Sequence, residues 1–218
     1  MTNYSRPRSG MIARLASLSD ASDPAVSRVL EAMSSIPRHM FVEPPLRHRA
    51  YSDCSLPIGR GQTLSQPMTV LSCLAAVDPG ESDTMLEVGS GSGYLAAVAG
   101  RLCSRVTGVE TMLELVHRSR NVIEELGLTN VLIQYGDGGA GWPSAAPYDC
   151  IIVSAAADAV HPGLFSQLSE GGRLGAPVSG DGGQSFRFFR KKDGRMEEYR
   201  AGFACRFVPL TGRFGSIE

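Results

Sequence analysis

The sequence lacks any regular arrangement of cysteines. Its five cysteines are scattered, odd in number and never form CxxC: Cys54, Cys73, Cys103, Cys150 and Cys205. This excludes a disulfide framework and a zinc knuckle as organising features of the fold. We therefore expect reduced thiols, as in a cytoplasmic protein, no bound metal, and cysteines that pack as small hydrophobic residues.

An excess of one charge is also missing. Lys and Arg number 21 against 22 Asp and Glu, which gives a net charge of -1 and a pI near 6.4. A domain that grips phosphate backbones is usually strongly basic, so we expect no nucleic-acid partner.

Long apolar runs are absent as well. No stretch reaches the ~20 residues that a membrane-spanning helix needs. Arg6 and Arg8, near the start, are not followed by the apolar segment of a signal peptide. The resulting expectations are no membrane association and a cytoplasmic location.

The first third of the chain is predicted to be helical, with one irregular loop. Residues 1–10 are polar and expected to be flexible, whereas apolar spacing predicts a helix over 11–18. Asp23 and Pro24 are typical of a helix start. Residues 44–64 lack periodicity and are rich in Pro and Gly, which is typical of a functional loop.

A third helix is expected after this loop. Ser65 precedes Pro67 and an apolar stretch, so Ser65 is placed to cap that helix. The cap is one interpretation of Ser65, and the resemblance described below suggests a second.

From residue 84 short apolar runs alternate with helical stretches. The predicted strands cover 84–88, 105–109, 131–135, 148–153 and 172–177, and the predicted helices cover 93–102, 112–126 and 162–169. This alternation is typical of βαβ units, with helices on both faces of a parallel sheet. Two further strands, at 185–190 and 196–208, flank a predicted hairpin turn at Asp193-Gly194.

A glycine-rich loop follows the first of these strands. It reads Glu87-Val88-Gly89-Ser90-Gly91-Ser92-Gly93-Tyr94. Glycines at the carboxyl end of a parallel strand let a ligand approach the backbone and the N-terminus of the next helix. Glu110 ends the following strand, where a carboxylate can accept hydrogen bonds from the hydroxyls of a ribose.

Two cofactors fit these features. Gly91, Gly93 and Ala96, with Glu110 beyond them, also satisfy the looser dinucleotide pattern, so NAD is one candidate. An acid at Glu87 suits a sulfonium amino acid better than a pyrophosphate. Gly136-Asp137-Gly138 follows the third strand, where Asp137 can accept the adenine amino group. These features favour S-adenosyl-L-methionine.

Several blocks outside the loop resemble one family. They are Ile36–Val42, Ala50–Asp53, Leu56–Gly59, Gly61–Pro67, Gly136–Gly138, Gly141–Pro143, Ala146–Asp149, Gly171–Leu174 and Phe207–Leu210. In order and spacing, from about residue 11 to 212, they are similar to protein-L-isoaspartate O-methyltransferases.

The resemblance implies a fold and a reaction. The fold is a doubly wound α/β domain over 11–218 with a seven-stranded, mostly parallel, Rossmann-like sheet. Residues 11–80 would form a helical cap and active-site loop, 81–180 the cofactor-binding core, and 181–218 the C-terminal strands. The reaction is methylation of L-isoaspartyl carboxylates in damaged proteins or peptides. The ester then closes to a succinimide, which starts repair, and we expect the protein to act as a monomer.

The resemblance also implies roles for individual residues. Those expected to bind the cofactor are Glu87, Gly89, Ser90, Gly91, Gly93, Glu110, Asp137 and Gly138. Those expected around the substrate are Asp53, Ile58, Gly59, Gln62, Thr63 and Ser65, with Ser65 holding the carboxylate. Asp53 is equally consistent with a residue that braces the loop. A carboxylate is already anionic at neutral pH, so no general base is required.

Three positions depart from the family pattern. They are His161, Gly175 and Ser179. If they lie beside the substrate pocket, as expected, the enzyme could methylate another carboxylate. A non-catalytic protein that binds the cofactor or isoaspartyl sites is the remaining alternative.

Overall fold

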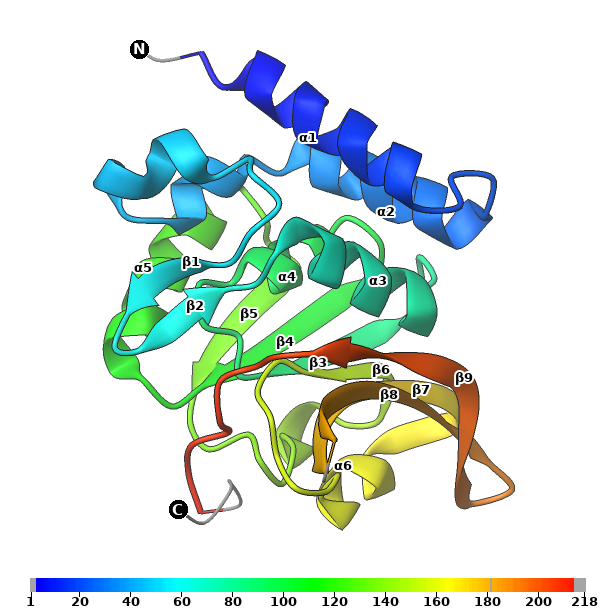
Figure 1. The fold of residues 1–218 in the computed structure, drawn as a ribbon. Helices are drawn as coiled ribbons and strands as arrows, with labels where there is room; N and C mark the ends of the chain where they lie inside the picture. The colour runs from blue at the N-terminus through cyan, green and yellow to red at the C-terminus, as the bar shows by residue number, and fades with distance from the viewer. Residues whose placement is uncertain (1–2, 181, 214–218) are drawn as a thin grey trace.

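The computed structural model describes residues 3–180 and 182–213. Its main element is a seven-stranded sheet in the order β5-β4-β3-β6-β7-β8-β9 (Figure 1). The strands are β3 (Thr84–Val88), β4 (Arg105–Glu110), β5 (Val131–Tyr135), β6 (Tyr148–Val153), β7 (Leu168–Gly180), β8 (Gly183–Lys192) and β9 (Arg195–Cys205). Strands β3 to β7 pair in parallel, and β8 is antiparallel to both its neighbours. The predicted fold class is confirmed.

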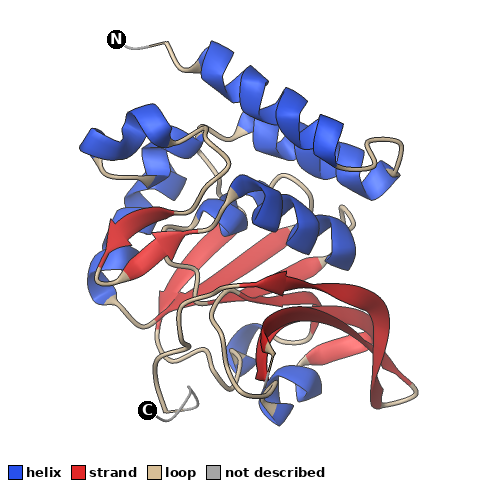
Figure 2. Cartoon of the chain, viewed as in Figure 1, coloured by secondary structure: helices blue, strands red, loops and turns tan. Residues whose placement is uncertain are grey.

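Helices cover the two faces of this sheet unequally. The α-helices are α1 (Ser5–Leu18), α2 (Pro24–Ser35), α3 (Pro67–Val77), α4 (Tyr94–Ala99), α5 (Leu113–Glu125) and α6 (Pro162–Ser166). Side chains of α1 to α5 join one core cluster with Met85 and Val106, whereas α6 packs on a second cluster with Leu86 and Val109. Successive strand residues alternate between the faces, so β3, β4, β6 and β8 contribute to both clusters. Figure 2 shows helices on both sides of the sheet.

The start of the chain differs from the prediction. Residues 1–10 were expected to be flexible, but α1 begins at Ser5, and residues 1–2 lie outside the described part. The reason is tertiary: the Tyr4 ring stacks on His39 with centroids 4.0 Å apart, and Met11 and Leu15 are buried. The Asp23 cap is confirmed, because its side chain accepts a hydrogen bond from the Ala25 N–H.

The segment 44–64 is more ordered than its sequence suggests. It contains a 3-10 helix, η2 (Pro44–Arg49), and an antiparallel hairpin of β1 (Leu56–Gly59) and β2 (Gln62–Leu64). Further 3-10 turns are η1 (Arg38–Phe41) and η3 (Pro143–Ala145). The hairpin lies beside the carboxyl ends of β3 and β4, where it meets the glycine loop (Figure 1).

The described residues contain no helix with the length and apolarity required to cross a membrane. They also contain no cluster of three or more His, Cys, Asp or Glu side chains arranged to hold a metal ion.

Candidate active site

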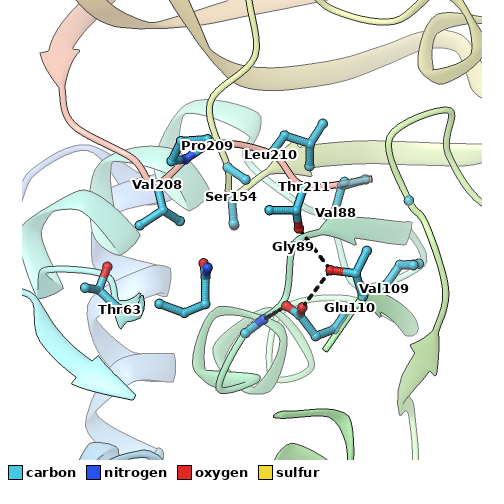
Figure 3. Close-up of a pocket in the computed structure, with 15 residues that line it drawn as sticks. Thr63, Val88, Gly89, Val109, Glu110, Ser154, Val208, Pro209, Leu210 and Thr211 are labelled. Carbon is cyan, nitrogen blue, oxygen red and sulfur yellow. Dashed lines mark hydrogen bonds between the residues drawn. The ribbon is translucent and has the colours of Figure 1, made fainter. Parts of the chain in front are cut away.

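A small cavity of about 40 Å³ lies at the carboxyl ends of β3 and β4. Its walls come from the glycine loop, from the end of β4, from the β1–β2 hairpin and from the C-terminal segment Val208–Thr211. Figure 3 shows Thr63, Gly89, Glu110 and Ser154 around it. In doubly wound folds, ligands bind at the carboxyl ends of the parallel strands, which is where this cavity lies.

The glycine loop adopts a conformation that only glycine accepts easily. Gly89, Gly91 and Gly93 have φ of +76°, +51° and +82°. A Cβ on Gly93 would lie 3.1 Å from Ser119 Cβ. Side chains at these positions would combine backbone strain with crowding, so the loop can stay close to a ligand only as glycine. The Ser90 side chain is buried beneath the loop.

Glu110 links the glycine loop to the cavity. Its Oε2 accepts the Gly91 N–H at 2.8 Å, and its Oε1 accepts the Met112 N–H at 2.9 Å. A carboxylate has about four acceptor positions, so capacity remains at Oε2 for a ribose hydroxyl. The structure therefore places Glu110 where the sequence predicted it.

Asp137 holds two backbone N–H groups, and its contact with the adenine amino group stays a prediction. Its Oδ1 accepts the Gly139 N–H at 2.9 Å, its Oδ2 accepts the Arg213 N–H at 2.7 Å, and it does not line the cavity. Through the hydrogen bond from Arg213, the Asp137 carboxylate holds the C-terminal segment in place. Its neighbour Gly138 does line the cavity, as expected.

Glu87 is a buried carboxyl below the loop, with an exposure of 2%. Burial raises the pKa of Glu87 to about 8, while hydrogen bonds from the Ser154 hydroxyl and the Ala96 backbone lower it less. Ser154 Oγ donates to Glu87 Oε1 at 2.8 Å, and Glu87 Oε2 has no hydrogen-bond partner within the described residues. A nearby cation would favour the ionised form, which suits a cationic cofactor.

This pKa predicts a pH-dependent stability. The folded chain binds the Glu87 proton more tightly than the unfolded chain, whose Glu pKa is about 4.5. The stability that Glu87 contributes through this proton is therefore fully present below about pH 4.5, and it is lost as pH rises through about 8. Glu87→Gln should lose this part of the pH slope in urea unfolding without cofactor between about pH 5 and about pH 8. An unchanged slope would mean that Glu87 is already ionised in the folded chain.

A second cavity of about 680 Å³ adjoins the first. It lies between the start of α3 and the end of β9, and it shares Thr63, Ser154 and Val208 with the small cavity. Its remaining described wall is rich in hydroxyls, and Arg206 is the charged residue among those that line it. The size and polarity suit an extended peptide segment beside the cofactor position.

Ser65 lines this large cavity but does not cap α3. The N-cap residue is Gln66, and within the described residues the Ser65 hydroxyl makes no hydrogen bond. Asp53 takes the capping role instead, because its Oδ1 accepts the Met68 N–H at 3.0 Å and its Oδ2 accepts Gln66 Nε2 at 2.9 Å. The expected cap at Ser65 is wrong, and Asp53 is a brace of the loop outside both cavity walls.

The remaining predicted substrate residues divide into two groups. Gln62 lines the small cavity and Thr63 lines both. Ile58 and Gly59 line neither. The Ile58 side chain is buried with Cδ1 3.3 Å from the Cβ position of Gly91, and Arg118 Nη2 donates to its carbonyl at 3.0 Å. The Ile58 side chain therefore packs against the glycine loop, and the contact of Ile58 and Gly59 with the substrate stays a prediction.

Comparison with known proteins identifies the family. Residues 15–215 match the model of the protein-L-isoaspartate(D-aspartate) O-methyltransferase (PCMT) family. The chain belongs to this family. Membership confirms the predicted methyltransferase activity on isoaspartyl carboxylates, with S-adenosyl-L-methionine as cofactor.

Two relatives are similar over most of their length. The protein-L-isoaspartate O-methyltransferase of Halorhodospira halophila is 45% identical over 188 residues, 85% of each chain. That of Desulfosudis oleivorans is 40% identical over 216 residues, 99% of this chain and 96% of its own.

Two solved structures share the fold. One of a protein-L-isoaspartate O-methyltransferase is 30% identical, with a TM-score of 0.82 over 95% of this chain and 67% of its own. Another, from Plasmodium falciparum in complex with S-adenosyl-L-homocysteine, is 24% identical, with a TM-score of 0.78 over 97% and 99%.

The three departures from the family pattern lie away from the large cavity. His161 Nδ1 accepts the Gly163 N–H at 3.0 Å and so caps α6. A Cβ on Gly175 would lie 2.7 Å from the Phe186 ring, so glycine there makes room for that ring. Ser179 lies in β7, opposite Gln184 of β8. None of them lines the large cavity, and their effect on substrate choice stays a prediction.

The C-terminal segment Val208–Thr211 forms a part of the small cavity's wall that the sequence did not indicate. The C-terminal segment is held by hydrogen bonds from Ala156 N–H to Val208 O at 2.8 Å and from Leu210 N–H to Ala156 O at 2.7 Å. Thr211 reaches Thr111 beside Glu110, with 3.1 Å between the hydroxyl oxygens (Figure 3). The Phe207–Leu210 block could have indicated this wall, because it is one of the segments that resemble the family, but the sequence suggested no role for it.

Proposed function

We propose that the chain methylates the isoaspartyl carboxylate where its two cavities meet, with Ser65 orienting the substrate. One observation carries this assignment. The Ser65 hydroxyl, unbonded within the described residues, lines the large cavity and also a pocket of about 30 Å³ shared with Gly89, Gly91 and Ser154. A donor there lies between the peptide-sized space and the glycine loop.

The chain has little proton chemistry to perform. S-adenosyl-L-methionine supplies an electrophilic methyl group, and the substrate carboxylate is already ionised at neutral pH. Ser65 would donate a hydrogen bond to the oxygen that does not attack and so fix the direction of the other. Orientation of this kind contributes about 7–11 kcal/mol in well-aligned reactions. The C-terminal segment and the hairpin would exclude water, which favours a step in which opposite charges neutralise each other.

Methyl transfer from labelled cofactor to an isoaspartyl peptide tests the proposal. The control is the same peptide with a normal aspartyl residue. We expect incorporation into the isoaspartyl peptide alone. Equal labelling of both peptides, or of neither, would contradict the assignment.

The cofactor assignment predicts a selective thermal shift. At about a hundredfold excess over its dissociation constant, S-adenosyl-L-homocysteine should raise Tm by about 5–10 °C. NAD should leave Tm unchanged, because the buried Glu87 carboxyl below the glycine loop suits a cationic sulfonium group and disfavours a pyrophosphate. Stabilisation by NAD alone in differential scanning fluorimetry would overturn the assignment.

A further inference from the structure

Arg38 is a buried cation without a carboxylate partner among the described residues. Its exposure is 0%, yet it forms no ion pair there. Its Nε donates to the Ala50 carbonyl at 2.7 Å and its Nη2 to the Cys54 carbonyl at 3.3 Å. Burying a charge without an ionic partner costs folding free energy, which indicates that the other contacts of Arg38 serve a function.

One set of contacts leads to the substrate side of the site. The two carbonyls bracket the segment 50–54, which carries Asp53. Asp53 in turn holds the Met68 N–H and the Gln66 amide. Met68 and Gln66 both line the large cavity, on the C-terminal side of Ser65. Two successive contacts therefore join the Arg38 guanidinium to the residues that follow Ser65.

The other contact leads to the cofactor side. The Arg38 guanidinium carbon lies 5.0 Å from the centroid of the Tyr94 ring. Tyr94 is the first residue of α4, directly after Gly93, and it is 1% exposed. The ring borders the pocket that Ser65 and Gly91 share. A planar guanidinium can stack on a ring and donate in its own plane at the same time, and an ammonium cannot.

We propose that Arg38 is a positioning residue that sets the place of Ser65 relative to the glycine loop by joining segment 50–54 to Tyr94. This inference rests on the proposed function of Ser65. It assigns to a residue outside both cavity walls the alignment that methyl transfer requires.

Arg38→Lys tests the inference, with Arg173→Lys as the matched control. Arg173 also donates to a backbone carbonyl, that of Asp78, at 2.9 Å, but it pairs with Asp83 and lines neither cavity. Turnover of an isoaspartyl peptide is divided by the concentration of sites that bind S-adenosyl-L-homocysteine, so that unfolded protein does not lower the measured kcat. We expect kcat per site to fall at least about tenfold in Arg38→Lys, with cofactor affinity nearly unchanged. Arg173→Lys should lower Tm and leave kcat per site unchanged.

A readout independent of turnover separates this inference from the proposed function. Amide hydrogen exchange at Met68 should accelerate in Arg38→Lys and not in Arg173→Lys, whatever substrate the wild-type protein accepts. If Arg38→Lys does not fold, Asp53→Ala breaks the same series of contacts at its next step. It should show the same loss of kcat per site and the same faster exchange. Wild-type kcat per site and wild-type exchange at Met68 in the folded variants would overturn the inference.

Discussion

Ser65→Ala is expected to lower kcat/KM for an isoaspartyl peptide about a hundredfold, the scale of a misplaced reacting group. Cofactor affinity should stay near wild type, because Ser65 lies outside the small cavity that holds Glu110. Stability should also stay near wild type. Ser65 makes no hydrogen bond within the described residues and does not cap α3, so its removal costs no cap.

Steady-state kinetics and thermal denaturation check this prediction together. Ser19→Ala is the control, because Ser19 is also part-buried and lies at the end of α1 away from both cavities. A Ser65→Ala protein that keeps wild-type kcat/KM would remove Ser65 from the mechanism. A fall of about 1 kcal/mol in the free energy of unfolding, the usual effect of losing an N-cap, would restore the capping role.

Glu110→Gln is expected to weaken binding of S-adenosyl-L-homocysteine by about 1.5–3 kcal/mol, the range for a hydrogen bond to a charged group. This corresponds to a dissociation constant about 10- to 150-fold higher. Glu110→Ala should have a larger effect, because it also frees the Gly91 and Met112 N–H groups that the carboxylate holds. The glycine loop would then lose part of its support before any ligand arrives.

Titration calorimetry measures both variants against Glu114→Ala. Glu114 is exposed and pairs with Arg60 outside the cavity, so its loss should not change the dissociation constant. An unchanged dissociation constant in a folded Glu110→Gln protein would mean that the ribose is held elsewhere.

The sheet and the glycine loop could be predicted because their signals are local. Apolar runs and glycine spacing mark β3 and the loop within a few residues of each other, and Glu110 follows at the end of the next strand. The hairpin β1–β2 left no such signal, because strands of four and three residues are too short to show a period.

The features that the sequence did not indicate are contacts between distant segments. The cap of α3 comes from Asp53, 15 residues before Met68, whereas sequence reasoning considers only the residue next to the helix. Asp137 is engaged by Arg213, 76 residues away, and the wall formed by Val208–Thr211 depends on its contacts with Ala156. Residue type and spacing indicate which groups are available, but tertiary packing decides which of them reach the cavity.

A crystal structure with S-adenosyl-L-homocysteine and an isoaspartyl peptide tests the account most directly. We expect the isoaspartyl carboxylate where the two cavities meet, with one oxygen about 2.7 Å from Ser65 Oγ, the usual length of such a hydrogen bond. The ribose should contact Glu110 Oε2. A carboxylate bound elsewhere in the large cavity, with Ser65 Oγ touching no substrate atom, would contradict the account.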